Sequence, residues 1–323
     1  MAIQPSGVIS LSDIQTEFGG SNPISISEYY RDGAYVTSNN TSVPTSGAIS
    51  LSNFYGATRE FSYTFSSSAQ QVNLSSTLTA AGWDGSSPVN VTVASGVYLW
   101  SNSTSVGGLT IPSSMSGLVT LTNYGYIIGR GGNAPGGNGG PALVNSATGV
   151  TLTNASGAFI AGGGGGGGGS GGGGGAGGGN GASLGGAYGG AGGAIGQSGS
   201  NGGVVYAGAL ASRGGAGGGA GGGGGNYEDS GSSFISYGGG GGGGRILPGA
   251  GGAGQCNPGA FGFGGGAGGS GGNAGGQGCN GGVGGGGGWG ARGGRSGGYG
   301  GAAILGTAIA SFTNNGTVYG STA

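Results

Sequence analysis

The sequence predicts a mainly β protein that carries an inserted glycine-rich domain. Short segments rich in β-branched and aromatic residues fill 59–161, whereas more than half of the positions in 162–301 are glycine. A Leu-Thr-Asn motif that precedes the glycine-rich stretch returns beyond it as Phe-Thr-Asn. We therefore expect a small N-terminal module (1–58), a β-sandwich or solenoid-like domain (59–161), a polyglycine II helix bundle (162–301) and a C-terminal β element (302–323) that returns to the β domain.

An internal repeat organises the first 58 residues. Pro5–Asp13 (PSGVISLSD) returns as Thr45–Asn53 (TSGAISLSN). Each copy reads as a short extended segment followed by polar residues that can cap a helix, so we expect a helical turn at 13–18 and at 53–55. A module this small has few apolar groups to bury, and we expect it to pack on a partner chain.

This repeat, with the intervening EFGGSNPISISEYYRDGAYV and the closing ISLSNFYGA, resembles the N-terminal segments of tailed-phage structural proteins, especially tail-fibre and tail-tip proteins. In those proteins the segment lies at the virion end. The resemblance implies that 1–58 binds other phage tail proteins, and it leaves the oligomeric state open, with a homotrimer as one alternative. The virion-attachment residues that follow from it are Ile9, Leu11, Tyr29, Tyr30, Ile49, Leu51 and Phe54.

Alternating and β-branched patterns predict strands through the second part, separated by Gly, Asn, Ser and Pro. Trp83 and Trp100 lie among them, and we expect both to be core anchors rather than ligand-binding residues. The predicted strands are Glu60–Phe65, Val89–Val93, Val97–Trp100, Leu109–Ile111, Leu118–Thr122 and Tyr126–Ile128.

A second repeat encloses the glycine-rich stretch. The segment 121–129 (LTNYGYIIG) recurs in 152–162 and again in 312–320 (FTNNGTVYG). Each copy reads as a strand, an Asn/Gly turn and a second strand, which is the form expected of rungs in a solenoid or of a sandwich edge. Because the third copy lies beyond the glycines, 162–301 is an excursion between β elements, and 131–141 is a shorter one of the same type.

The glycine-rich stretch allows three states. Collagen is excluded because glycine does not recur at every third position. A flexible linker is the simplest alternative. A bundle of extended threefold glycine helices needs neighbours that supply hydrogen bonds and that have no Cβ atoms in the way. The returning repeat and the gathering of bulky residues between pure glycine runs favour the bundle.

The interruptions of the glycine runs carry nearly all of the bulk and charge of this stretch, and Tyr, Phe, Trp and Arg on rigidly held loops are typical of recognition surfaces. Aromatic rings stack on sugars, and Arg binds phosphate or carboxylate through two hydrogen bonds. Cys256 and Cys279 are either two buried thiols or a disulfide between neighbouring helices. The candidate receptor-binding residues are Tyr206, Arg213, Tyr227, Phe234, Tyr237, Arg245, Phe261, Trp289, Arg292 and Tyr299.

Glycine blocks interrupted by aromatic patches behind a β domain resemble the distal adhesins of T-even-type phage long tail fibres. The resemblance implies a polyglycine II sandwich whose loop tips bind a host surface glycan, lipopolysaccharide or an outer-membrane protein. Two other functions fit the sequence. One is a purely structural virion component, such as a spacer, tip or decoration, and the other is an antifreeze-type glycine bundle.

Composition argues against other classes of function. The chain has no histidine and a formal net charge of −1, so it has neither the usual general base nor the basic surface that nucleic acid requires. We expect no enzyme activity, catalytic residue, cofactor or metal site, and no membrane insertion. The start MAIQPSGVIS lacks the features of a signal peptide. We expect assembly in a host cytoplasm and release in an extracellular virion.

Overall fold

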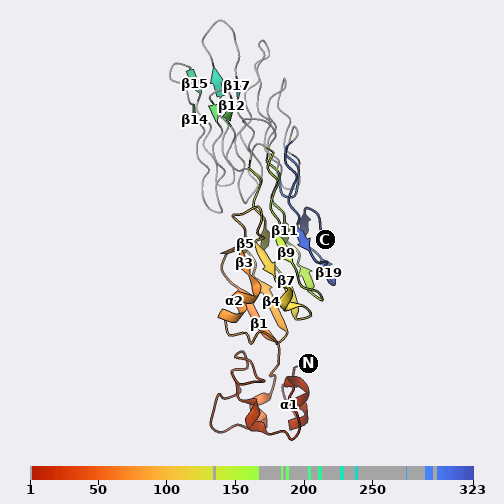
Figure 1. Cartoon of the computed structure of the whole chain (residues 1–323). Coiled ribbons are helices and arrows are strands. Elements are labelled where there is room, and N and C mark those ends of the chain that lie inside the picture. The colour runs from red at the N-terminus through yellow and green to blue at the C-terminus, as the bar shows by residue number, and fades with distance from the viewer. Residues whose placement is uncertain are drawn as a thin grey trace.

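The structure, a computed structural model, describes residues 2–133, 136–166, 274, 288–293 and 297–323, together with the backbone of six short strands between 183 and 238. The molecule is elongated, with the N-terminal helix α1 (Leu11–Phe18) at one end and the labelled strands of the glycine-rich stretch at the other (Figure 1). Those six strands form two antiparallel sheets of three. They are β12 (Ser183–Leu184), β13 (Ala187–Tyr188), β14 (Gly203–Val204), β15 (Leu210–Ser212), β16 (Asn226–Glu228) and β17 (Tyr237–Gly238).

The two copies of the N-terminal repeat fold alike. In the first copy, the Ser10 amide donates to the Asp13 carboxylate at 2.8 Å, and α1 begins at Leu11, the residue after Ser10. In the second copy, the Ser50 amide donates to the Asn53 side chain at 2.8 Å and starts the 3₁₀ turn η2 (Leu51–Phe54). Both are capping boxes, which satisfy amides that have no partner inside the helix. A further 3₁₀ turn, η1 (Ile26–Tyr29), lies between the copies.

The N-terminal module has a hydrophobic core of its own. The rings of Phe18, Tyr29 and Phe54 pack at centroid distances of 6.3–6.4 Å and are at most 2% exposed. The expectation of few buried apolar groups is therefore wrong, because irregular segments contribute core residues that no periodic pattern reveals. The buried hydrophobic residues of this core are Ile3, Ile9, Ile14, Phe18, Tyr29, Val36, Val43, Phe54 and Ala57.

Hydrogen bonds hold the segment that leads from the module into the β domain. The Asn40 side chain donates to the Thr58 carbonyl and accepts from the Thr58 amide, both at 2.8 Å. The Glu17 carboxylate accepts from the Arg59 amide at 2.8 Å, and the Asn39 amide group donates to the Ser62 carbonyl at 3.0 Å. These bonds fix the connection instead of leaving a free linker.

The β domain is a parallel β-solenoid with three sheets. Each of the first four rungs contributes one strand to each sheet, the fifth rung contributes to the first two sheets, and all pairs within these sheets are parallel. The first sheet holds β1 (Phe61–Phe65), β4 (Val89–Val93), β7 (Val119–Asn123), β10 (Thr151–Asn154) and β19 (Ser311–Asn314). The second holds β2 (Ala69–Gln70), β5 (Tyr98–Trp100), β8 (Tyr126–Ile128), β11 (Phe159–Ala161) and β20 (Thr317–Tyr319). The third holds β3 (Val72–Asn73), β6 (Leu109–Ile111), β9 (Leu143–Asn145) and β18 (Ile304–Gly306).

Equivalent side chains of successive rungs stack inside the solenoid. Leu121 pairs in register with Leu152, and both are fully buried. Phe312 is the next residue of the same column and is 36% exposed, because it belongs to the last rung. At the other end, helix α2 (Leu74–Ala80) buries Leu74 and Leu78 completely. A short 3₁₀ turn, η3 (Ser113–Met115), follows β6.

The sequence located the solenoid closely. Strands Val89–Val93, Leu109–Ile111 and Tyr126–Ile128 have the predicted bounds, and the three copies of the second repeat are successive rungs in register. Of the two architectures that the repeat allowed, the structure has the solenoid. Trp83 is buried, as expected, but Trp100 lies partly exposed on the outer face of the second sheet.

The glycine-rich stretch leaves the solenoid at the corner between the second and third strands of a rung, where the connection lengthens from rung to rung; the other long connection, 74–88 with α2, lies between the first and second rungs. The corner between the second and third strands is Gln71 alone in the first rung, 101–108 in the second and 129–142 in the third. In the fourth rung it is 162–303, which contains the whole glycine-rich stretch. The chain then returns to place β18 beside β9, and β19 and β20 beside β10 and β11.

The described base of the inserted stretch is held by its backbone. The Gly163 amide donates to the Gly140 carbonyl at 2.9 Å, and the Gly301 amide donates to the Gly163 carbonyl at 2.7 Å. A Cβ on Gly163, Gly301 or Gly298 would lie 2.0–2.1 Å from a carbonyl oxygen of a neighbouring segment. None of these three has a φ in the left-handed region, so glycine is required here by close packing. The segments that meet are 129–133, 137–140, 162–166, 288–293 and 297–301.

Among the helices that the structure describes, none has the length and hydropathy needed to cross a bilayer.

Candidate functional site

Arg292 and Tyr299, two of the predicted receptor-binding residues, form one exposed pair at the base of the inserted stretch. The guanidinium carbon of Arg292 lies 4.8 Å from the centroid of the Tyr299 ring, and Tyr299 is 65% exposed. The Arg292 Nε donates to the Gly297 carbonyl at 3.1 Å, which fixes the guanidinium over the ring. Such a cation–π pair presents a flat aromatic face and hydrogen-bond donors side by side.

Trp289 does not present its ring to a partner, contrary to the prediction. It is 8% exposed and packs against Phe159 at a centroid distance of 4.6 Å and against Tyr319 at 5.4 Å. Tyr126 stacks on the other side of Phe159 at 4.2 Å, and Tyr98 follows at 4.7 Å. These rings form a column on the outer face of the second sheet, and Trp289 joins the returning glycine-rich chain to it.

Replacing Trp289 with Ala is expected to destabilise the base of the inserted stretch by about 3 kcal/mol, the scale of a buried Trp truncation. Hydrogen–deuterium exchange at the Gly290 and Ala291 amides should rise, whereas exchange in β4 and β7 should be unchanged. Tyr124→Ala, which removes a ring that is 51% exposed, is the control and should leave both regions unchanged. If the Gly290 amide exchanged as slowly in Trp289→Ala as in the wild type, Trp289 would not anchor the returning chain.

Most of the other predicted receptor-binding residues lie outside the described residues. Tyr227 and Tyr237 are the exceptions, since the backbones of β16 and β17 pair them directly opposite each other. The remaining candidates, including the two cysteines, are Tyr206, Arg213, Phe234, Arg245, Cys256, Phe261 and Cys279.

The predicted virion-attachment residues mainly build the interior of the N-terminal module. Ile9, Tyr29 and Phe54 are 6% exposed or less. The Tyr30 hydroxyl donates a hydrogen bond to the Gly47 carbonyl, which holds the turn of the second repeat in place. These side chains therefore shape the module, and of the three buried ones only Ile9 also lines a groove on its surface. Leu11, Ile49 and Leu51 are partly buried against the same core.

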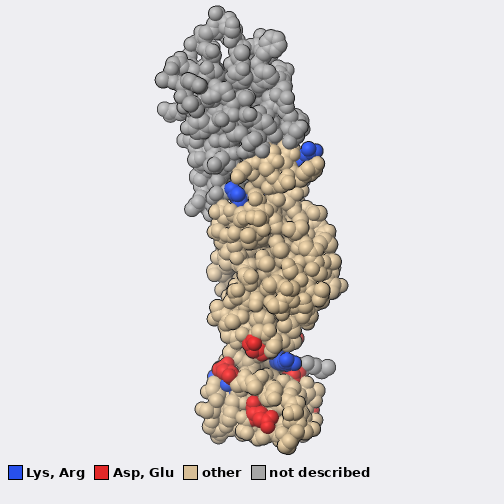
Figure 2. All heavy atoms as spheres, viewed as in Figure 1, with Lys and Arg blue, Asp and Glu red and all other residues tan. Residues whose placement is uncertain are grey.

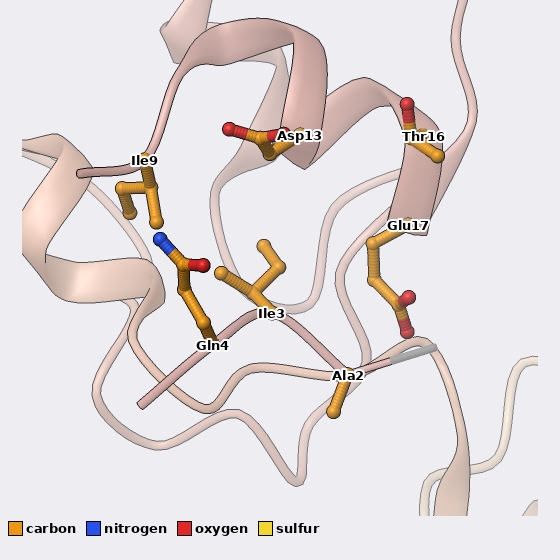
Figure 3. Close-up of a pocket in the computed structure, with 7 residues that line it drawn as sticks. All are labelled: Ala2, Ile3, Gln4, Ile9, Asp13, Thr16 and Glu17. Carbon is orange, nitrogen blue, oxygen red and sulfur yellow. The ribbon is translucent and has the colours of Figure 1, made fainter. Parts of the chain in front are cut away.

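The groove on the N-terminal module lies beside α1. Its cavity volume is about 330 Å³, and Figure 3 shows its lining side chains, with Asp13 and Glu17 on α1 and Ala2, Ile3 and Gln4 on the first segment of the chain. Positions four residues apart lie on one face of a helix, which places both carboxylates along the same side. The lining residues are Ala2, Ile3, Gln4, Ile9, Asp13, Thr16 and Glu17.

The groove carries negative charge. Hydrogen bonds from the Ser10 hydroxyl and the Ser10 amide, each 2.8 Å long, lower the pKa of the Asp13 carboxyl, so it stays ionised at neutral pH. Glu17 is 9% exposed, and its Oε1 accepts from the Thr58 hydroxyl at 3.1 Å and from the Arg59 amide. These bonds hold both carboxylates in fixed positions.

Sequence reasoning missed this groove, although Asp13 and Glu17 at helical spacing inside the predicted helix were a usable signal. Charge is also unevenly placed along the chain. Residues 2–58 hold four acids and one arginine, whereas 85–161 hold Arg130 alone. Figure 2 shows the acids gathered at the end of the molecule that carries the N-terminal module.

Within the part of the chain that the structure describes, no three His, Cys, Asp or Glu side chains gather as a metal site would require.

The chain is similar to a solved structure described as the gp37-gp38 adhesin tip complex of the bacteriophage S16 long tail fibre. The match covers 100% of both chains at 19% sequence identity, with a TM-score of 0.41. No protein-family model matches the sequence, and no curated protein does.

Proposed function

We propose that this chain is a structural protein of a tailed-phage virion, a tail fibre or tail-tip adhesin, and that it acts by binding rather than by catalysis. The observation that carries the proposal is the separation of two surfaces along one elongated molecule (Figure 1). The module that resembles virion-attachment segments lies at one end. The strands that hold Tyr227 and Tyr237 lie at the other end.

The solenoid suits the role of a rigid support between these ends. The glycine-rich stretch leaves between the second and third strands of the fourth rung, and its labelled strands lie at the end of the molecule opposite the N-terminal module (Figure 1). We propose that the backbone packing seen at the base continues as a polyglycine II bundle through 162–301. The close approach of Gly163, Gly298 and Gly301 to neighbouring carbonyls supports this, because such packing excludes every side chain.

We further propose that the interruptions of the glycine runs bind the host surface, through a glycan, lipopolysaccharide or an outer-membrane protein. Aromatic and Arg side chains on a rigid base lose little conformational entropy on binding. The exposed Arg292–Tyr299 pair is a described example of this chemistry, although it lies at the base.

Purified full-length chain is expected to compete with the phage that carries it for adsorption to host cells. Replacing Tyr227, Phe234 and Tyr237 together with Ala should weaken competition at least about tenfold, since aromatic hot spots contribute roughly 2 kcal/mol each. Tyr124→Ala on the solenoid is the matched control and should compete like the wild type. If saturating wild-type protein leaves adsorption unchanged, the chain has a spacer role in the virion and the host-binding proposal fails.

A further inference from the structure

We propose that the exposed turn of the first N-terminal repeat, residues 4–8, is the contact through which the module attaches to its neighbour in the virion, and that Val8 enters an apolar socket of that neighbouring protein. The inference rests on the proposed attachment role of residues 1–58. It names the side chain that makes the contact and the chemistry of the partner surface.

Val8 is the most water-exposed large hydrophobic residue in the part of the chain that the structure describes. Its side chain is 91% exposed, and every residue of the turn from Gln4 to Val8 is exposed. Val8 therefore contributes almost nothing to the core of the module. Removing such a side chain from water against an apolar surface is favourable, and a partner protein can supply that surface.

The backbone on both sides of Val8 is held in place. The Tyr55 hydroxyl donates to the Gly7 carbonyl, and the Gln4 side chain donates to the Val8 carbonyl. The next residue, Ile9, is 6% exposed and belongs to the core of the module. Because valine is also stiff at its one side-chain torsion, a partner that covers it orders little that is not ordered already.

The second repeat shows that the turn folds without a valine. Its residues 45–48 are exposed like those of the first turn, and Ala48 stands at the position of Val8. The glycine that precedes this position is in the left-handed region in both copies, with φ +101° at Gly7 and +85° at Gly47. A tyrosine hydroxyl also bonds to this glycine carbonyl in both copies, from Tyr55 in the first and from Tyr30 in the second. The additional methyl groups of Val8 are therefore not required by the turn, and they are free to contact a partner.

The charge of the module favours a different protein as the occupant. Residues 2–59 hold four acids and two arginines, so two copies of the module would repel each other, and an anionic lipid surface would repel the module. A single protruding valine matches a socket on a folded protein, where an apolar centre is enclosed by polar groups. The polar groups on this side are Ser6 and Ser10, which flank the turn and are exposed.

The test measures binding of the purified full-length chain to phage particles grown without it, made in a host that carries a phage genome with this gene disrupted. The particles are sedimented, and the bound chain is measured over a range of concentrations. The wild type should bind saturably. Val8→Ala should bind about tenfold more weakly, since it removes two methyl groups from an apolar contact. Val8→Asp, which would place a charge in the socket, should lose binding altogether.

The chain supplies the controls for these variants. Val8→Ala introduces the residue that the second repeat already carries, so it should unfold at the same temperature as the wild type. Val106→Ala makes the same substitution at a valine that is 39% exposed on the solenoid, and it should bind particles like the wild type. Equal weakening in Val8→Ala and Val106→Ala would mean that the effect is not specific to the turn.

Full binding by Val8→Ala and Val8→Asp would refute this inference and leave the attachment role standing. Absence of binding by the wild type would refute the attachment role, and this inference with it. Self-association of the purified chain that Val8→Asp abolishes, seen by analytical ultracentrifugation, would make a second copy the occupant and overturn the proposal. The adsorption experiment is separate, because a chain that binds particles through Val8 but does not compete for host cells would refute host binding alone.

Discussion

A Gly163→Ala variant is expected to lose the packed base of the inserted stretch while keeping the solenoid. The new Cβ would lie 2.0 Å from the Arg130 carbonyl oxygen and 2.3 Å from its carbon, both backbone atoms that cannot rotate away. The segments must therefore separate, which breaks the bonds from Gly163 to Gly140 and from Gly301 to Gly163. We expect a local cost of at least about 3 kcal/mol, the upper range for overpacking by one methyl group. Hydrogen–deuterium exchange at the Gly163 and Gly301 amides measures it.

Gly96→Ala is the control for this variant. Gly96 lies in a turn of the solenoid with φ +76°, and a Cβ there would meet no atom within 4 Å. Alanine should cost only about 1 kcal/mol at this position, because the penalty comes from backbone conformation alone. If Gly163→Ala destabilised the protein no more than Gly96→Ala does, close backbone packing would not be the reason for glycine at the base of the inserted stretch.

The solenoid could be predicted from the sequence because its strands bury one face. In Val89–Val93 the buried and half-buried positions alternate, and this produces the pattern of residue types from which the strand was predicted. The Leu-Thr-Asn repeat also indicated which distant segments lie beside each other, since 121–123, 152–154 and 312–314 are in register. The corner at which the insertions leave follows from the same repeat.

The role of Trp289 could not be predicted from its neighbours in sequence. It stands between glycines, where a large ring indicates an exposed loop. Its burial depends on Phe159 and Tyr319, which belong to two different rungs of the solenoid. A column of rings on the outer face of a sheet arises only from the register of those rungs.

The N-terminal module shows a different limit. Its apolar residues were predicted to contact a partner because the segment resembles virion-attachment segments, and short irregular segments display no buried face in their sequence that would have indicated a core. Tyr29 and Phe54 are instead fully buried, in part through contacts with Phe18 on α1. The acidic groove beside α1 was accessible to sequence reasoning only through the spacing of Asp13 and Glu17.

An Asn154→Leu variant is expected to destabilise the solenoid by about 3 kcal/mol. Asn154 is fully buried in a ladder that joins three rungs: it accepts from Asn123 at 2.9 Å and donates to Asn314 at 2.8 Å and to the Thr317 carbonyl at 3.2 Å. Leucine has a similar size but makes none of these bonds. The Asn123 amide and the Thr317 carbonyl then each lose a partner in or near the interior, at about 1–3 kcal/mol per unsatisfied buried group. Equilibrium denaturation followed by far-ultraviolet circular dichroism measures the loss.

Asn314→Leu, at the exposed end of the same ladder, is the control for this variant. Comparing the two losses of stability tests whether the position of an Asn in the ladder affects what its hydrogen bonds contribute. Asn314→Leu removes one bond of the Asn154 amide but leaves the bonds to Asn123 and to the Thr317 carbonyl in place, so it should cost only about 1 kcal/mol, less than Asn154→Leu. Equal losses in the two variants would mean that the ladder gains nothing from its burial. A loss at Asn154 alone would instead place the ladder among the interactions that fix the register of the fourth and fifth rungs. That register determines where the inserted stretch leaves the solenoid and where it returns.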